Sequence, residues 1–178
     1  QIFLSASKAQ AHGFKTYIKN FVMQSIEVDL QGDPISITLP CGNTVQLIFL
    51  GTNAKTAQSY HGDLYFDEFF WVHGFATLKK VASAMAAQKQ YTKTYFSTPS
   101  SKTHEAYKFW TGEAFNKGKS KENRIEIDTA HDHLKNGALC GDKMWRHIVN
   151  IYDAERQGCD LFDIEELIAE NSSEEFAN

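Results

Sequence analysis

The chain has 178 residues, 42% of them hydrophobic and 22% charged, which excludes wholesale disorder and fits one ordinary globular domain. Lys and Arg together number 18 against 22 Asp and Glu, so a basic surface over the whole fold is not predicted, although a local basic patch remains compatible with the count. No apolar run approaches the roughly 20 residues of a membrane span, and three scattered cysteines predict free thiols rather than a disulfide framework or a four-ligand zinc site.

The first quarter of the chain predicts a strand followed by a helix. Ile2-Phe3-Leu4 is an apolar strand with no Met before it, so we expect a strand entered part-way through a longer protein. Ser7 and Gln10 fit a capping box at the start of a helix over residues 8–24. Its apolar positions recur at helical spacing; they are Ala11, Phe14, Ile18, Phe21 and Val22.

Alternating segments follow at residues 26–30, 35–39 and 44–50, with a turn at 40–43. They predict a small β-meander that ends in a hairpin.

From residue 63 the pattern becomes that of an α/β protein. Leu64-Tyr65-Phe66 is continuously apolar, as expected for a strand buried on both faces of a parallel sheet. Strands that alternate with helices predict such a sheet, with right-handed crossovers. The remaining expected elements are helices at 74–89 and 103–116, strands at 92–96, 124–128 and 145–151, a loop at 117–123, and a last helix capped by Asp163 and ending near residue 170.

Two acidic residues directly follow the buried strand. Asp67 and Glu68 would lie at the carboxyl edge of the sheet, where ligands bind in such folds. In a nucleoside triphosphatase the first acid helps to hold Mg²⁺ and the second polarises the attacking water. Because successive strand residues face opposite ways, this pairing works only where the strand ends and twists. A solvated acidic pair at a strand end is the alternative.

Two small hydroxyl residues follow the next predicted strand. Ser97 and Thr98 would lie beside the acids and could bond a γ-phosphate or its water and report hydrolysis. A Ser/Thr turn stopped by Pro99 explains the same residues without a ligand. One helix separates the acidic and hydroxyl segments, and this spacing favours the joint nucleotide-site interpretation.

Several segments together resemble the large (ATPase) subunits of tailed-phage terminases. Residues 2–11 are similar to the strand-to-helix segment that follows the phosphate-binding loop in that family. Residues 51–68 resemble the approach to its Walker B strand, and residues 95–100 resemble its coupling motif. The similarity continues to Asn178 and covers essentially the whole chain.

The resemblance implies a partial P-loop NTPase sheet of the ASCE/RecA-like type, with helices on both faces, a small β-meander and a C-terminal helical extension. Residues 1–116 would be ATPase core, and residues 117–178 a subdomain leading towards a nuclease domain outside the chain. It also implies that Asp67 takes the Mg²⁺ role through water, Glu68 the catalytic role, and Ser97 with Thr98 the coupling role. Lys55 lies where some terminases carry a trans-acting arginine, but lysine cannot form a bidentate clamp.

The implied function is ATP-driven translocation of double-stranded viral DNA into a procapsid. The implied partners are the DNA, the portal protein, the small terminase subunit and further copies in a ring, in the host bacterial cytoplasm and without a membrane. ATP and Mg²⁺ would be cofactors of the intact protein.

No Gly-x-x-x-x-Gly-Lys-Ser/Thr occurs in the sequence, so the backbone N–H groups and lysine that bind phosphates are missing. We therefore expect no tightly bound cofactor, no ATP hydrolysis and no DNA cleavage by this piece alone.

Other functions compete with the motor. The parent could be a helicase- or restriction-type DNA translocase, or this piece could be a non-catalytic assembly module that docks to the portal or small subunit. Asp128, His131, Asp132 and His133 could form a metal site, although polar loop composition explains them too. The basic residues Lys79, Lys80, Lys117, Lys119 and Lys121 could contact DNA, and residues 69–71 could stack on a base, but solvated surface and core packing are the preferred interpretations.

Overall fold

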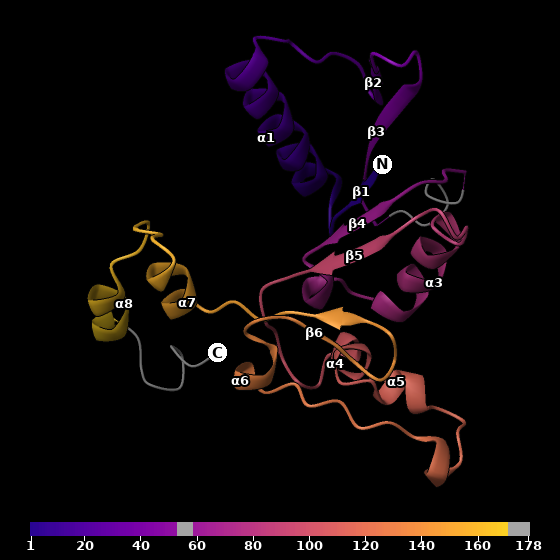
Figure 1. Ribbon diagram of the computed structural model, residues 1–178, viewed down its shortest axis with the longest axis vertical. Coiled ribbons are helices and arrows are strands. Elements are labelled where there is room, and N and C mark those ends of the chain that lie inside the picture. Colours follow the sequence, from indigo (N-terminus) through magenta and orange to yellow (C-terminus); the bar gives the residue numbers. More distant parts are fainter. Residues whose placement is uncertain (53–58, 171–178) are drawn as a thin grey trace. The chain divides into compact units, whose positions relative to one another are not determined.

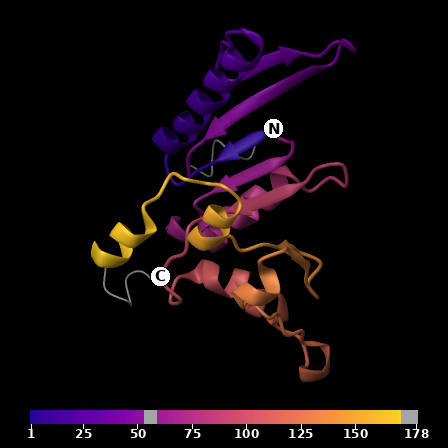
Figure 2. The same cartoon turned by 60° about the vertical axis from the view of Figure 1, so that its left-hand side comes forward.

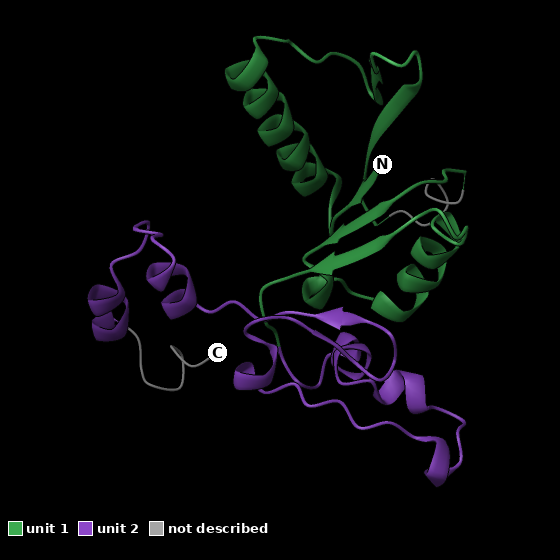
Figure 3. Ribbon diagram, viewed as in Figure 1, with its two compact units in different colours: residues 1–100 green, residues 101–178 purple. Residues whose placement is uncertain are grey.

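The computed structural model describes residues 1–52 and 59–170. The chain divides into two compact units, residues 1–100 and residues 101–178 (Figure 3). The sequence predicts a different boundary, at residue 116, between the ATPase core and the subdomain that leads towards a nuclease domain. That functional boundary stays a prediction.

The first unit is built on a five-stranded sheet with the order β2-β3-β1-β4-β5 (Figures 1 and 2). Only the β2–β3 hairpin is antiparallel, and the other three pairings are parallel. The hairpin that the sequence predicts is therefore one side of the main sheet. The strands are β1 (Ile2–Leu4), β2 (Ile35–Thr38), β3 (Thr44–Leu50), β4 (Leu64–Asp67) and β5 (Lys93–Phe96).

Helices cover both faces of the sheet, as predicted. On one face the Phe3 ring stacks between Phe49 and Tyr65, with centroids 5.1 and 5.0 Å away, and meets Phe14 of α1 (Lys8–Ile26). On the other face the fully buried Phe66 ring contacts Phe75 of α3 (Phe75–Met85). Burial on both faces explains why β1 is continuously apolar, and the apolar run Leu64–Phe66 of β4 is covered in the same way, with Tyr65 half-buried.

Helix α1 begins where the sequence predicts and ends later. Ser7 is its N-cap, and its hydroxyl accepts a hydrogen bond from the Gln10 N–H at 3.2 Å. The helix continues to Ile26, and Glu27 closes it in the left-handed conformation with φ 56°. The predicted strand at 26–30 is therefore wrong. The expected core position Phe21 is wrong too, because this side chain is 69% exposed.

The second unit has short elements with turns between them. Its helices are α4 (Glu105–Trp110), α5 (Glu113–Asn116), η2 (Lys121–Asn123), α6 (His131–Leu134), α7 (Ile151–Arg156) and α8 (Ile164–Glu170), and its strands are β6 (Ala138–Leu139) and β7 (Trp145–Arg146). Left-handed Gly112 splits the helix predicted at 103–116. The last helix is confirmed, and Asp163 accepts a hydrogen bond from the Glu166 N–H.

Two strand predictions fail in this unit. Residues 124–128 form no strand, because the side-chain amide of Asn116 bonds both the N–H and the carbonyl of Ile125 and so replaces a partner strand. Only Trp145 and Arg146 of the segment 145–151 are in a strand, and Asn150 starts α7 with a capping box.

Candidate functional site

The carboxyl ends of three neighbouring strands carry the candidate site. Strands β1, β4 and β5 are parallel, and their register places Leu4 opposite Phe66 and Asp67 opposite Phe96. Each of these strands runs into polar residues. Ser5 follows β1, Asp67 ends β4 and Glu68 comes directly after it, and Ser97 with Thr98 follow β5.

Glu68 lies at a sharp turn that interrupts the alternation of the strand. Strand β4 ends at Asp67, and Glu68 has φ 50° and ψ 42°, in the left-handed region. This conformation costs a non-glycine residue on the order of 1–2 kcal/mol. The turn is the twist that an adjacent acidic pair needs, and it allows the two carboxylates to engage different neighbouring strands.

Asp67 engages the β1 side of the site. The Ser5 hydroxyl donates to Asp67 Oδ2 at 2.7 Å, and Ser5 is only 1% exposed. The Ser5 backbone N–H also donates to the Leu50 carbonyl. Ser5 is thus fixed by the sheet and holds one oxygen of the aspartate.

Glu68 engages the β5 side. Its Oε2 lies 2.9 Å from the Ser97 hydroxyl, 2.9 Å from the Thr98 hydroxyl and 3.1 Å from the Thr98 N–H. The Ser97 hydroxyl also lies 2.8 Å from the Thr98 carbonyl, so its single proton serves one of these two acceptors at a time. Glu68 therefore meets both hydroxyl residues that the sequence singles out, whereas Asp67, its neighbour in the chain, bonds Ser5 instead.

A short 3-10 turn after Glu68, η1 (Phe69–Trp71), adds two donors to this cluster. The Phe70 N–H donates to the Ser97 hydroxyl at 3.2 Å, and the Trp71 indole Nε1–H donates to the Thr98 hydroxyl at 2.8 Å. Of the three aromatic residues, Phe69 is buried and Trp71 is 58% exposed, so the segment is only partly core.

The cluster leaves one oxygen of each carboxylate available. Within the part of the chain that the structure describes, no hydrogen bond reaches Asp67 Oδ1 or Glu68 Oε1. Carboxylate and hydroxyl oxygens are the ligands that Mg²⁺ accepts in proteins. The donor set at Asp67 therefore fits a magnesium ion held through water, and the catalytic role of Glu68 stays a prediction.

Lys55 lies outside the described residues. Among the residues at 1–52 and 59–170, no group of three or more His, Cys, Asp and Glu could hold a metal. His131 instead bonds Asp153 within the second unit. No helix in the described ranges has the length and apolar character that crossing a membrane requires.

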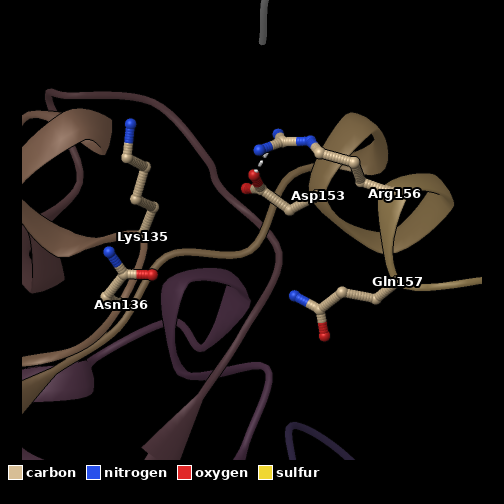
Figure 4. A pocket seen from close by; sticks show the side chains of 5 residues that line it. All are labelled: Lys135, Asn136, Asp153, Arg156 and Gln157. Atoms are coloured by element: carbon tan, nitrogen blue, oxygen red, sulfur yellow. Dashed lines mark hydrogen bonds and ion pairs between the residues drawn. The ribbon is translucent and has the colours of Figure 1, made fainter.

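A polar pocket of about 320 Å³ lies beside α7 in the second unit (Figure 4). Its Arg156 is paired with the buried carboxylate of Asp153 at 2.8 Å. Hydrogen bonds from the Asn150 N–H and from His131 hold the pKa of Asp153 below its ordinary value. These charges are paired with one another, which is typical of a structural network.

Ser5 is a residue of this cluster that sequence reasoning missed, and for Trp71 the sequence suggested base stacking or core packing rather than a hydrogen bond to Thr98. Ser5 directly follows an apolar strand, as Ser97 does, and this shared position is the signal that could have revealed it. Nothing local in the sequence distinguishes Trp71 from its aromatic neighbours.

A mostly parallel sheet with helices on both faces and an Asp-Glu pair at its carboxyl edge defines a partial α/β domain of the nucleoside triphosphatase type. The comparisons with known proteins narrow this class. Residues 1–178 match the family described as terminase large subunit, T4likevirus-type, N-terminal, and the chain belongs to that family. This membership favours the terminase resemblance over a helicase- or restriction-type translocase.

Two curated phage proteins are similar to the chain. The "Terminase, ATPase subunit" of Escherichia phage P2 is 55% identical over 179 residues, which cover 100% of this chain and 30% of that protein. The "Probable terminase, ATPase subunit" of Haemophilus phage HP1 is 44% identical over 168 residues, which cover 94% of this chain and 27% of that protein. The chain thus spans less than a third of each relative.

Proposed function

We propose that this chain is part of an ATP-driven motor that translocates double-stranded viral DNA into a procapsid. The observation that carries the proposal is the convergence of Glu68 with Ser97 and Thr98 beside Asp67 at one edge of the sheet. Family membership supports it, because both curated relatives are named as terminase ATPase subunits. The proposed partners are the DNA, the portal protein, the small terminase subunit and further copies of the whole protein, in the host cytoplasm.

In this proposal each side chain of the cluster has one task. Glu68 orients water and accepts its proton at Oε1, while Oε2 stays bonded to the β5 hydroxyls. Ser97 and Thr98 connect the position of Glu68 to the end of β5, so that a change at the nucleotide alters the backbone that leads into the rest of the molecule. Asp67, fixed by Ser5, contributes an oxygen to the metal-binding side.

A bound Mg²⁺ would neutralise charge on the phosphates during transfer. The Asp67 carboxylate is the group of this cluster that would hold it, through water. The sequence carries no phosphate-binding loop of the Gly-x-x-x-x-Gly-Lys-Ser/Thr form, and in this proposal the whole protein supplies the remaining phosphate contacts.

The test replaces Glu68 by Gln in the whole terminase subunit. Gln keeps the size of the side chain and can still accept from Ser97 and Thr98, but it cannot take a proton from water. We expect steady-state ATP hydrolysis to fall at least 100-fold, because positioned general-base catalysis contributes on the order of 10²–10⁴-fold, while nucleotide affinity changes little. Unimpaired hydrolysis or packaging by E68Q would exclude the proposal.

A further inference from the structure

The Trp71 indole and the Glu68 carboxylate together fix where the Thr98 hydroxyl proton points. A hydroxyl has one proton and two lone pairs, whereas an indole N–H can only donate. Trp71 Nε1–H therefore occupies a lone pair of the Thr98 oxygen at 2.8 Å. The Thr98 proton is then left to bond Glu68 Oε2 at 2.9 Å.

Glu68, the η1 turn and Thr98 form a closed ring of covalent and hydrogen-bond connections. Glu68 leads directly into the η1 turn, and the turn returns through Trp71 to Thr98, which bonds Glu68. Trp71 does this with a side chain that is 58% exposed. Packing against the core therefore does not account for its position, and the indole hydrogen bond is the directional contact that holds it.

We propose that Trp71 is a positioning residue, whose indole N–H directs the Thr98 hydroxyl to Glu68 and so fixes the Glu68 carboxylate for the hydrolytic step. The expected effect on ATP hydrolysis rests on the proposed function. The positioning of Thr98 by Trp71 rests on the hydrogen-bond geometry alone. Trp71 would act through Thr98 and would not touch the nucleotide.

The kinetic test compares Trp71→Phe, Thr98→Val and the double variant in the whole terminase subunit. Phe keeps an aromatic ring and removes the N–H. Because a neutral hydrogen bond contributes about 0.5–1.5 kcal/mol, we expect kcat to fall about 2- to 13-fold in W71F with KM unchanged. In the T98V background the indole has already lost its acceptor, so W71F should cause no further loss.

A matched control is Trp145→Phe, because Trp145 is also exposed, at 63%, and belongs to the second unit. This variant should keep the wild-type kcat. Independent, multiplicative losses in W71F and T98V would overturn the positioning role, as would a change confined to KM.

A spectroscopic measurement separates this inference from the proposed function. In the whole protein labelled with ¹⁵N-tryptophan, the indole N–H resonance of Trp71 is assigned by its loss in W71F. Thr98→Val should shift this resonance, and Thr98→Ser, which keeps the hydroxyl, should restore it. If E68Q hydrolyses ATP normally while T98V still shifts the resonance, the motor proposal fails and the hydrogen bond stands. An unshifted resonance in T98V overturns the positioning inference whatever the kinetics show.

Discussion

Replacement of Ser5 by Ala tests the link between the end of β1 and the first acid of the site. The Ser5 hydroxyl is 1% exposed and donates to Asp67 Oδ2 at 2.7 Å. A hydrogen bond to a charged group contributes about 1.5–3 kcal/mol. Asp67 is only half-buried, so water can partly replace the lost donor, and we expect the free energy of unfolding to fall by about 1.5 kcal/mol, the lower end of that range.

The assay is urea denaturation followed by circular dichroism. For an m value of about 2–3 kcal/mol/M, the expected loss lowers the midpoint by about 0.5–0.75 M with no change in m. Asp67→Ala provides the second side of a double-mutant cycle. In that background the Ser5 hydroxyl is buried without its acceptor, so removing it should be nearly neutral or slightly stabilising.

The outcome that would refute this reasoning is an equal cost of S5A with and without Asp67. It would mean that Ser5 stabilises the sheet through packing, and that the contact with the aspartate contributes nothing.

Two further predictions concern positions outside the cluster of Asp67, Glu68, Ser97 and Thr98. Arg146 is 3% exposed and bonds both Asp142 oxygens at 2.7 Å. Its replacement by Ala should cost about 3–5 kcal/mol of stability, because the Asp142 side chain, itself 3% exposed, loses its only described cationic partner. The Arg146 hydrogen bonds lower the pKa of Asp142. This stabilisation should therefore be present above the pKa of an unfolded-state aspartate, near 3.9, and be lost as the pH falls through the folded-state pKa. Acid denaturation of wild type and R146A measures the effect, and identical acid midpoints would contradict it. Gly51→Ala should destabilise by about 1–3 kcal/mol in the same urea assay, since its Cβ would lie 2.6 Å from the Lys8 backbone nitrogen. The control Gly13→Ala, with open space around it inside α1, should stabilise by about 0.5–1 kcal/mol, and equal effects of the two variants would refute the close approach.

Local sequence patterns predicted an element correctly where the residues of one strand, or of one helix cap, are enough to specify it. The apolar residues of β1 and β4 predict strands, and Ser7 predicts the start of α1; both are confirmed. Predictions from local patterns were wrong where contacts with other parts of the chain determine the conformation. The alternation at 26–30 indicates a strand, but α1 extends to Ile26 and only Leu30 of the alternating set is buried. At Ile125 a side-chain amide satisfies the backbone that a strand partner would otherwise bond.

By itself, the sequence determined that two acids end one buried strand and two hydroxyl residues follow the next, because both facts depend only on neighbours along the chain. Only the tertiary structure decided how these groups pair. Asp67 bonds Ser5, 62 residues before it, and Glu68 bonds Thr98, 30 residues after it. Such partners are chosen by the order of strands in the sheet and by the left-handed turn at Glu68, and hydrogen bonds across that distance in sequence exist only once the strands have paired.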